Sequence, residues 1–389
     1  MSRPNILYLI PDEWRQRGMG FRGEDPVLTP NIDRLAAESV ELENVISNYP
    51  VCTPHMGMLF TGQYPCTARV MGNANSSTSQ FMCRLPVHTT CLPDVLEANG
   101  YYCGYVGKWH LDSPVMEDQA YLEEVRSDGK VWDAFTPESR RHHFRYWFSF
   151  GCNDQHYQPH YWDNTNKIEE RSDFPGMWSP EVEAERVIDF IKNKDNVRPK
   201  DQPFFLMWAP NPPHMPFEQV PQRFKDLFKD KSWEELLLSP AFTEMTGPAP
   251  ELPQDMQAQY EANMTLAKEE VRDYFAQIAG VDYYIGEVLK ALDEAGLKED
   301  TLVVFASDHG DLMGSHGLIR KGPWFDDSVK IPYLIRWPGK LKPGKRNFLM
   351  NTPDIFPTLV SMVGLKDQLP SSIEGQDLSR FIMEEGLED

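Results

Sequence analysis

The chain has 389 residues, of which 41% are hydrophobic and 12% aromatic, and its formal net charge is −21 at pH 7. The apolar content is enough for a substantial core, which excludes a disordered chain. The negative charge comes without clustered Lys and Arg, so we expect no nucleic-acid partner. The length suits one large α/β domain over residues 1–389, and we expect loop-rich insertions at about 113–180 and 217–255.

The hydrophobic pattern predicts strands that alternate with helices along the chain. Short apolar runs predict buried strands at residues 5–10, 40–46, 101–106, 204–208, 301–306 and 331–337. Periodicity and capping signals predict helices at residues 30–39, 92–98, 180–193, 259–295 and 352–363. This alternation indicates an α/β fold, with a mostly parallel central sheet and helices on both faces.

The sequence carries no stretch typical of membrane insertion or export. The chain runs directly into its first strand, and no apolar run reaches the roughly 20 residues that a bilayer requires. All six cysteines lie within the first 152 residues, at spacings unlike a zinc site or a disulfide framework. We therefore expect no membrane partner and a cytoplasmic location, or a periplasmic or secreted one if a leader has been removed.

A cysteine lies in a stretch that predicts a turn followed by a helix. Thr53 is a suitable N-cap and Pro54 a suitable first helical residue. Cys52 would then precede a helix N-terminus, whose dipole favours an anion and lowers the pKa of a thiol. A buried structural cysteine is the alternative interpretation.

Four of the predicted strands end in polar clusters, after residues 10, 106, 208 and 306. Ligand sites of open parallel sheets lie beyond the carboxyl ends of the strands, so the clusters predict one active site. Asp12 and Glu13 follow the first of these strands, and Asp308 and His309 follow the last. Carboxylates with one imidazole suit a divalent cation, whereas the alternatives are a solvated strand end and a turn.

Lysine and histidine side chains are the other candidates for chemistry at the strand ends. Lys108 and His110 are one residue apart, so on an extended chain they would point to the same side. His214 lies between prolines, which hold a loop rigid as a general acid requires. A lone lysine such as Lys321 is usually just solvated, so residue type alone does not assign it a role.

The stretch from Cys52 to Pro65 resembles the signature of the type I sulfatases of the alkaline phosphatase-like superfamily. The resemblance rests on Cys52-x-Pro54, the helix that follows, and Thr-Gly-Gln-Tyr-Pro at residues 61–65. In that family the cysteine is converted to formylglycine, whose hydrated aldehyde is the nucleophile. Similar motifs follow in the family's order, at residues 107–110 (Gly-Lys-Trp-His), 212–214 (Pro-Pro-His), 308–309 (Asp-His) and 320–322 (Arg-Lys-Gly).

The resemblance implies a metal-dependent hydrolase of sulfate esters with a formylglycine derived from Cys52. The four ligand candidates would hold one divalent cation, for which we expect Ca²⁺ with Mg²⁺ or Mn²⁺ as alternatives. Lys108 and Lys321 would bind the sulfate, His110 would act as base on the covalent intermediate, and His214 would assist the leaving alcohol. The substrate would be a small-molecule or saccharide sulfate ester, and a formylglycine-generating enzyme would be the maturation partner.

Two features depart from the family pattern. Met56 occupies the position of the motif arginine, and a thioether has no hydrogen-bond donor. The small C-terminal antiparallel subdomain of the family is also not expected within these 389 residues. The alternatives are therefore a phosphonate or phosphate diester hydrolase of the same superfamily and a catalytically inactive relative.

Overall fold

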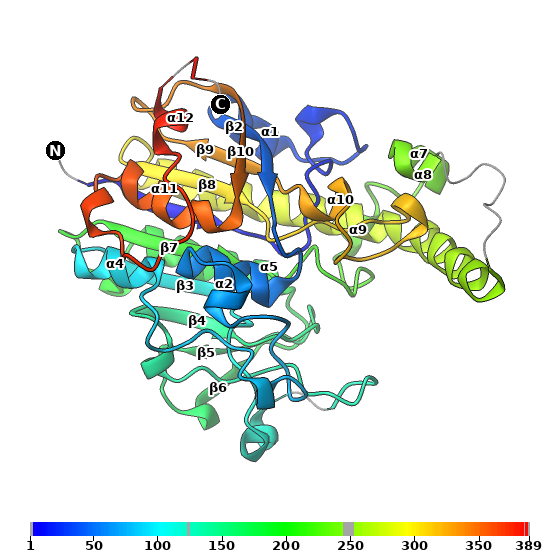
Figure 1. Ribbon diagram of the computed structural model, residues 1–389, viewed down its shortest axis with the longest axis horizontal. Helices are drawn as coiled ribbons and strands as arrows, with labels where there is room; N and C mark the ends of the chain where they lie inside the picture. The colour runs from blue at the N-terminus through cyan, green and yellow to red at the C-terminus, as the bar shows by residue number, and fades with distance from the viewer. Residues whose placement is uncertain (1–2, 123–124, 244–252, 385, 388–389) are drawn as a thin grey trace.

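The computed structural model describes residues 3–122, 125–243, 253–384 and 386–387. Its described part contains a ten-stranded sheet in the order β10-β2-β9-β8-β1-β7-β3-β4-β5-β6 (Figure 1). The strands are β1 Asn5–Leu9, β2 Val40–Ile46, β3 Tyr102–Lys108, β4 Tyr146–Phe150, β5 His160–Asp163, β6 Arg171–Asp173, β7 Phe204–Ala209, β8 Thr301–Ala306, β9 Tyr333–Arg336 and β10 Gly344–Asn351. The central strands β8, β1, β7, β3 and β4 are parallel, which confirms the predicted fold class.

Helices cover both faces of this sheet because its central strands are apolar on both sides. Leu7 and Leu9 of β1 face one core, whereas Ile6 and Tyr8 face the other. The first core packs against α1 Pro30–Ala37, α5 Ser179–Ile191 and α9 Gln254–Glu294. The second packs against α2 Cys52–Thr61, α4 Leu92–Ala98 and α11 Ile355–Met362.

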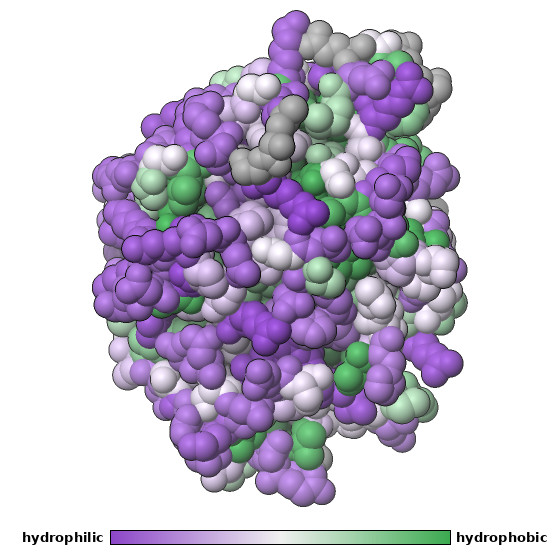
Figure 2. Space-filling model, turned by 90° about the vertical axis from the view of Figure 1, so that its left-hand side faces the viewer, coloured by the Kyte–Doolittle hydropathy of each residue, from purple (hydrophilic) through white to green (hydrophobic). Residues whose placement is uncertain are grey.

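Shorter helices lie in the connections between the strands. They are α3 Pro65–Ala68, α6 Gln222–Lys225, α7 Trp233–Leu236, α8 Pro240–Thr243, α10 Asp326–Val329 and α12 Ser379–Met383. Among the described residues, no helix combines the length and apolar character needed to cross a bilayer. Figure 2 shows one face of the molecule that is mainly hydrophilic, with hydrophobic residues in small separate groups.

Most of the predicted elements agree with the structure, but two regions differ. The first region, residues 113–180, was expected to be loop-rich, and its short strands β4, β5 and β6, which the prediction did not locate, extend the sheet at one edge. The second region, residues 217–255, contains the short helices α6, α7 and α8, and residues 244–252 are outside the described part. β10 was also missed, because its mainly exposed residues lack a strong apolar pattern.

A buried carboxyl group lies in the core between α5 and the sheet. Glu183 is fully buried, and it accepts hydrogen bonds from the Tyr161 hydroxyl (2.8 Å) and from Nε1 of Trp208 (2.9 Å). Burial raises the pKa of Glu183 to about 8, although these two hydrogen bonds oppose the shift. The folded protein therefore keeps this group protonated at pH values where the unfolded chain ionises it.

Glu183→Gln is expected to stabilise the protein increasingly as the pH rises from 5 to 9. The pKa of Glu183 is higher in the folded protein than in the unfolded chain, so its contribution to the free energy of unfolding is fully present below about pH 4.5. This contribution is lost as the pH rises through about 8. The free energy of unfolding of the variant should gain up to about 4 kcal/mol relative to the wild type, as measured by urea titration. Glu185→Gln, exposed on the same helix, is the control. A difference that does not change with pH would contradict this account.

Candidate active site

The polar clusters that follow the parallel strands lie together at one edge of the sheet. β1, β3, β7 and β8 are neighbours and run in the same direction, so their carboxyl ends meet. The side chains at or just after these ends are Asp12, Glu13, Lys108, His110, Asn211, His214, Asp308 and His309. α2 brings Cys52 to the same place from the layer of helices above the sheet.

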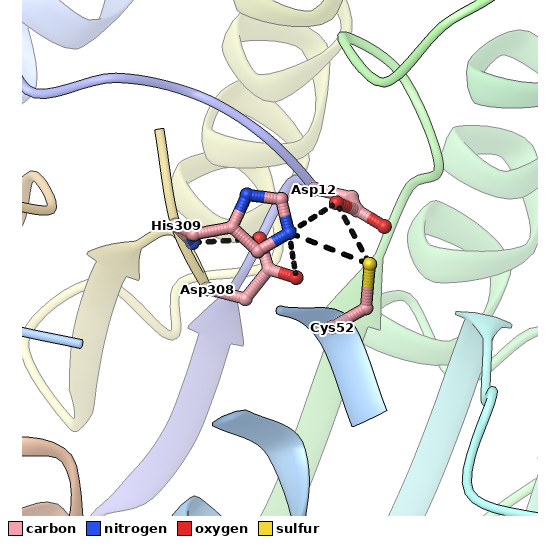
Figure 3. A group of neighbouring side chains, drawn as sticks. All are labelled: Asp12, Cys52, Asp308 and His309. Carbon is pink, nitrogen blue, oxygen red and sulfur yellow. Dashed lines mark hydrogen bonds and ion pairs between the residues drawn. The ribbon is translucent and has the colours of Figure 1, made fainter. Parts of the chain in front are cut away.

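Cys52 lies where the groups from different strands meet (Figure 3). Its Sγ atom is 3.6 Å from Oδ1 of Asp12 and 3.4 Å from Nε2 of His309. Nζ of Lys108 lies 4.0 Å from the same sulfur. The side chain at position 52 therefore faces carboxylate, imidazole and ammonium groups together.

The start of α2 differs from the expectation in one detail that concerns the cysteine. The helix begins at Cys52 with Val51 as N-cap, so Thr53 is not the cap. Thr53 Oγ1 instead donates to the carbonyl oxygen of His110 (2.7 Å) and accepts from the Ala74 N–H (3.2 Å). The threonine thereby fixes the cysteine turn against the segment after β3.

The predicted lowering of the pKa of the Cys52 thiol is wrong. Burial, and then the charge of Asp12, raise the pKa of this thiol well above its ordinary value. Lys108 and Lys321 act in the opposite direction but do not compensate. The sequence indicated a helix N-terminus but could not indicate the depth at which the sulfur is buried.

Asp308 and His309 are oriented by their own backbone surroundings. Oδ1 of Asp308 accepts from the Glu13 N–H (3.0 Å) and the His309 N–H (2.9 Å), while its Oδ2 lies 3.2 Å from Nε2 of His309. Nδ1 of His309 lies 3.1 Å from the Gly310 carbonyl oxygen, so it carries the proton. The Nε2 lone pair is thereby directed towards Asp12 and Asp308, as in metal-binding histidines.

The donor set fits a divalent cation. Asp12, Asp308, His309 and Cys52 each offer a ligand atom, all within 4.8 Å of one another. Burial and the charge of Asp12 raise the pKa of Asp308 to about 8, which reflects two carboxylates that converge in the protein interior. A cation bound between these oxygens would remove that repulsion.

Glu13 lies beside this group but has different partners. Its Oε2 is 3.1 Å from Nζ of Lys321 and 3.4 Å from Nε2 of His214. It shares a second group of potential ligands with Asp12 and His214, separate from Asp308 and His309. Its fully buried Oε1 has no partner among the described residues, so this oxygen remains available to a cation.

Lys108 is held by two side chains, one of which sequence reasoning missed. Its Nζ lies 2.6 Å from Oδ2 of Asp12 and 2.9 Å from Oδ1 of Asn211. Asn211 is fully buried, and its amide nitrogen donates to Asp154 Oδ1 and the Asn153 carbonyl, both at 3.1 Å. Its position directly after β7, between Pro210 and Pro212, was the signal that could have identified it.

His110 and His214 are both buried, and the orientation of His110 differs from the expectation. His110 has φ +47°, so the chain is not extended there, and the argument that placed it on the same side as Lys108 fails. Its Nε2 lies 3.0 Å from the Ala74 carbonyl oxygen, and its Nδ1 is buried without a partner among the described residues. His214 holds Nδ1 against the Met215 carbonyl (2.7 Å), which turns Nε2 towards Glu13.

Met56 lines a small cavity at the bottom of the site. This cavity of about 20 Å³ is bounded by, among others, Cys52, Lys108, His110 and Asp308. Met56 is 6% exposed and packs in one of the two hydrophobic cores of the sheet. The position that is an arginine in the family motif is therefore occupied by an apolar side chain, which lines the cavity beside Cys52.

Comparisons with known proteins agree with this architecture. A family model described as Sulfatase matches residues 4–365. The chain belongs to the sulfatase family. An endo-4-O-sulfatase of Bacteroides thetaiotaomicron is 39% identical over 100% of this chain and 74% of that protein. An ulvan-active sulfatase of Formosa agariphila is 34% identical over 98% of this chain and 65% of that protein.

A solved structure shows the same fold as this sulfatase. It comes from work on glycosaminoglycan metabolism by Bacteroides thetaiotaomicron, and it superposes with a TM-score of 0.88 at 38% identity. The match covers 100% of this chain and 78% of that chain. The predicted family, fold class and reaction class, sulfate ester hydrolysis, are confirmed, while the roles of individual site residues stay predictions.

Proposed function

We propose that this sulfatase hydrolyses the sulfate ester of a saccharide through a formylglycine formed from Cys52. One observation carries the proposal: the Cys52 side chain lies within 4.0 Å of Asp12, Lys108 and His309, which come from three different strand ends. A nucleophile at this position would meet cationic and metal-binding groups at once. The relatives named endo-4-O-sulfatase and ulvan-active sulfatase support a saccharide as the alcohol.

The cation would be held by Asp12, Asp308 and His309, with Glu13 contributing the oxygen that has no partner. When bound, the cation would supply Lewis-acid stabilisation of negative charge on the sulfate. The oxygen-rich set favours Ca²⁺ after maturation removes the sulfur of Cys52, with Mg²⁺ and Mn²⁺ as alternatives.

Two lysines would offset the charge that builds up on the sulfate oxygens. Burial lowers the pKa of Lys108, but Asp12 and the other acidic groups around it, including Asp154, together raise this pKa above the ordinary value. The pKa of Lys321 is likewise raised, against burial, by Cys52 and by the carboxylates of Glu13 and Asp12. Both lysines therefore remain charged, and as preorganised cations they stabilise the transition state.

The two histidines would move protons. Burial, and then the charges of Lys321 and Lys108, lower the pKa of His214 to about 3, so the ring is neutral before substrate enters. Negative charge on the departing oxygen would favour protonation at Nε2, the nitrogen that faces the site. Nδ1 of His110, which has no partner among the described residues, would take a proton from the covalent intermediate.

His214→Ala is expected to slow esters of poor leaving groups far more than esters of good ones. An alkyl or sugar sulfate should lose about 10²- to 10⁴-fold in kcat, whereas 4-nitrophenyl sulfate should lose much less, since nitrophenolate departs without a proton. Steady-state kinetics with both substrates measure the difference. His88→Gln, at an exposed histidine that is not among the residues lining the active-site cavity, is the control. Equal losses on both substrates would argue against a proton donor.

Parallel assays test the proposed function itself. Protein produced with a formylglycine-generating enzyme and supplied with Ca²⁺ is expected to hydrolyse aryl sulfates and sulfated oligosaccharides, and aryl phosphonate monoesters much more slowly. A sulfate monoester presents three terminal oxygens to the two lysines and the metal ligands, whereas a phosphonate monoester presents only two. Turnover of the phosphonate with none of the sulfates would replace the proposal by the phosphonate hydrolase alternative.

A further inference from the structure

A second cluster of potential metal ligands lies at the beginning of α4 and shares no residue with the active site. Cys91, Asp94 and His142 each offer a ligand atom, and these atoms lie within 4.8 Å of one another. Cys91 is fully buried and His142 is 7% exposed. The cluster joins two segments that are 48 residues apart in the sequence, the start of α4 and the turn before β4.

Asp94 is held at the centre of this cluster from three sides. Its Oδ2 lies 3.0 Å from Nδ1 of His142 and accepts from the Cys91 N–H at 2.8 Å. Its Oδ1 lies 2.8 Å from Nδ1 of His143, which is largely exposed and is not among the three ligand candidates. His143 therefore orients the carboxylate from outside, as second partners of metal ligands commonly do.

The cluster is accessible from solvent on one side. A surface cavity of about 610 Å³ is lined by Asp94, His142 and His143, and also by His88. Nε2 of His142 is buried and has no hydrogen-bond partner among the described residues. A buried imidazole nitrogen without a partner is uncommon unless something binds it, and His142 is one of the residues that line this cavity.

We propose that Cys91, Asp94 and His142 form a second metal site, which binds a thiophilic divalent cation such as Zn²⁺. One thiolate, one imidazole and one carboxylate form a ligand set that suits Zn²⁺ and disfavours Ca²⁺. Binding transfers the Cys91 thiol proton to solvent and ends the contact of Sγ with the Thr89 carbonyl (3.5 Å). Three protein ligands leave the fourth position of a tetrahedral ion open to the cavity.

This site differs from the active site in a way that an experiment can resolve. The active-site oxygens suit Ca²⁺, and the site loses its sulfur once Cys52 is converted. The second site keeps its thiolate in the mature protein. Co²⁺ is therefore the probe, because a cobalt–thiolate bond gives a charge-transfer absorption that oxygen and nitrogen ligands do not give.

The expected result is that one equivalent of Co²⁺ gives this band in Ca²⁺-loaded protein, and that Zn²⁺ abolishes it by competition. Cys52→Ser and His143→Gln should keep the band. Cys91→Ser should abolish it, and His142→Gln should weaken Zn²⁺ binding at least about tenfold by calorimetry. Circular dichroism checks that each variant is folded. If Cys91→Ser does not fold, the proposal is tested by Zn²⁺ binding to Asp94→Asn and His142→Gln instead.

Three results would overturn the proposal. The first is a band that persists in Cys91→Ser or disappears in Cys52→Ser, which would place the thiolate ligand elsewhere. The second is Zn²⁺ affinity unchanged in both Asp94→Asn and His142→Gln. The third is no binding of Co²⁺ or Zn²⁺ beyond the active-site equivalent.

Discussion

Replacing Cys52 with alanine is expected to lower kcat for sulfate esters by at least about 10⁴-fold, because it removes the group that would become the nucleophile. The side chain lies within 4.0 Å of Asp12, Lys108 and His309, and alanine leaves those groups in place. Substrate binding should therefore change little, so the loss appears in kcat rather than in KM. Steady-state assays with 4-nitrophenyl sulfate and a sulfated oligosaccharide measure both constants.

Mass spectrometry of the peptide that contains position 52 completes this test. In the wild-type protein, made with a formylglycine-generating enzyme, this peptide should lose one sulfur and two hydrogen atoms and gain one oxygen. Cys66→Ala, at an exposed cysteine outside the site, is the matched control and should retain activity. Wild-type activity with position 52 still a thiol would show that the chemistry does not use formylglycine.

Asp308→Asn is expected to weaken metal binding at least about 100-fold and to lower kcat by a comparable or larger factor. The substitution removes one of two carboxylates that converge at the candidate metal site, while the amide oxygen still accepts the Glu13 and His309 N–H groups. Without metal, the variant should be more stable than the wild type above about pH 8. Wild-type Asp308 loses its proton through that pH, and its charge is buried beside Asp12.

Metal analysis, kcat and thermal unfolding with and without a chelator measure these effects. Asp201→Asn, at an exposed carboxylate, is the control and should change none of them. In the wild type, the chelator should abolish activity and Ca²⁺ should restore it. An Asp308→Asn protein that keeps full metal content and activity would exclude this residue from the ligand set.

The sequence by itself determined the fold class and the place of the site. Apolar runs such as residues 5–10 and 301–306 indicated strands buried on both faces, as the structure shows. Parallel strands place their carboxyl ends at one edge, so polar residues after several strands had to lie near one another. The local hydrophobic pattern and this rule of topology were sufficient to predict that Asp12, Lys108 and Asp308 lie near one another.

Tertiary structure alone decided the partners of each side chain. Glu13 lies against Lys321 and His214, Asn211 holds Lys108, and the pKa of Cys52 is raised where the local pattern predicted a lower value. These facts depend on burial and on contacts between residues hundreds of positions apart, which periodicity does not encode.

The edge of the sheet and the second cluster of potential metal ligands were not predicted, for two different reasons. β4, β5 and β6 are only five, four and three residues long, so their short segments gave a weak local signal. Cys91, Asp94 and His142 show no recognisable metal-ligand spacing along the chain, and only the packing of α4 against the turn before β4 brings them together. Side-chain chemistry can be read from the residues, but its assembly into sites depends on which distant segments the folded core brings into contact.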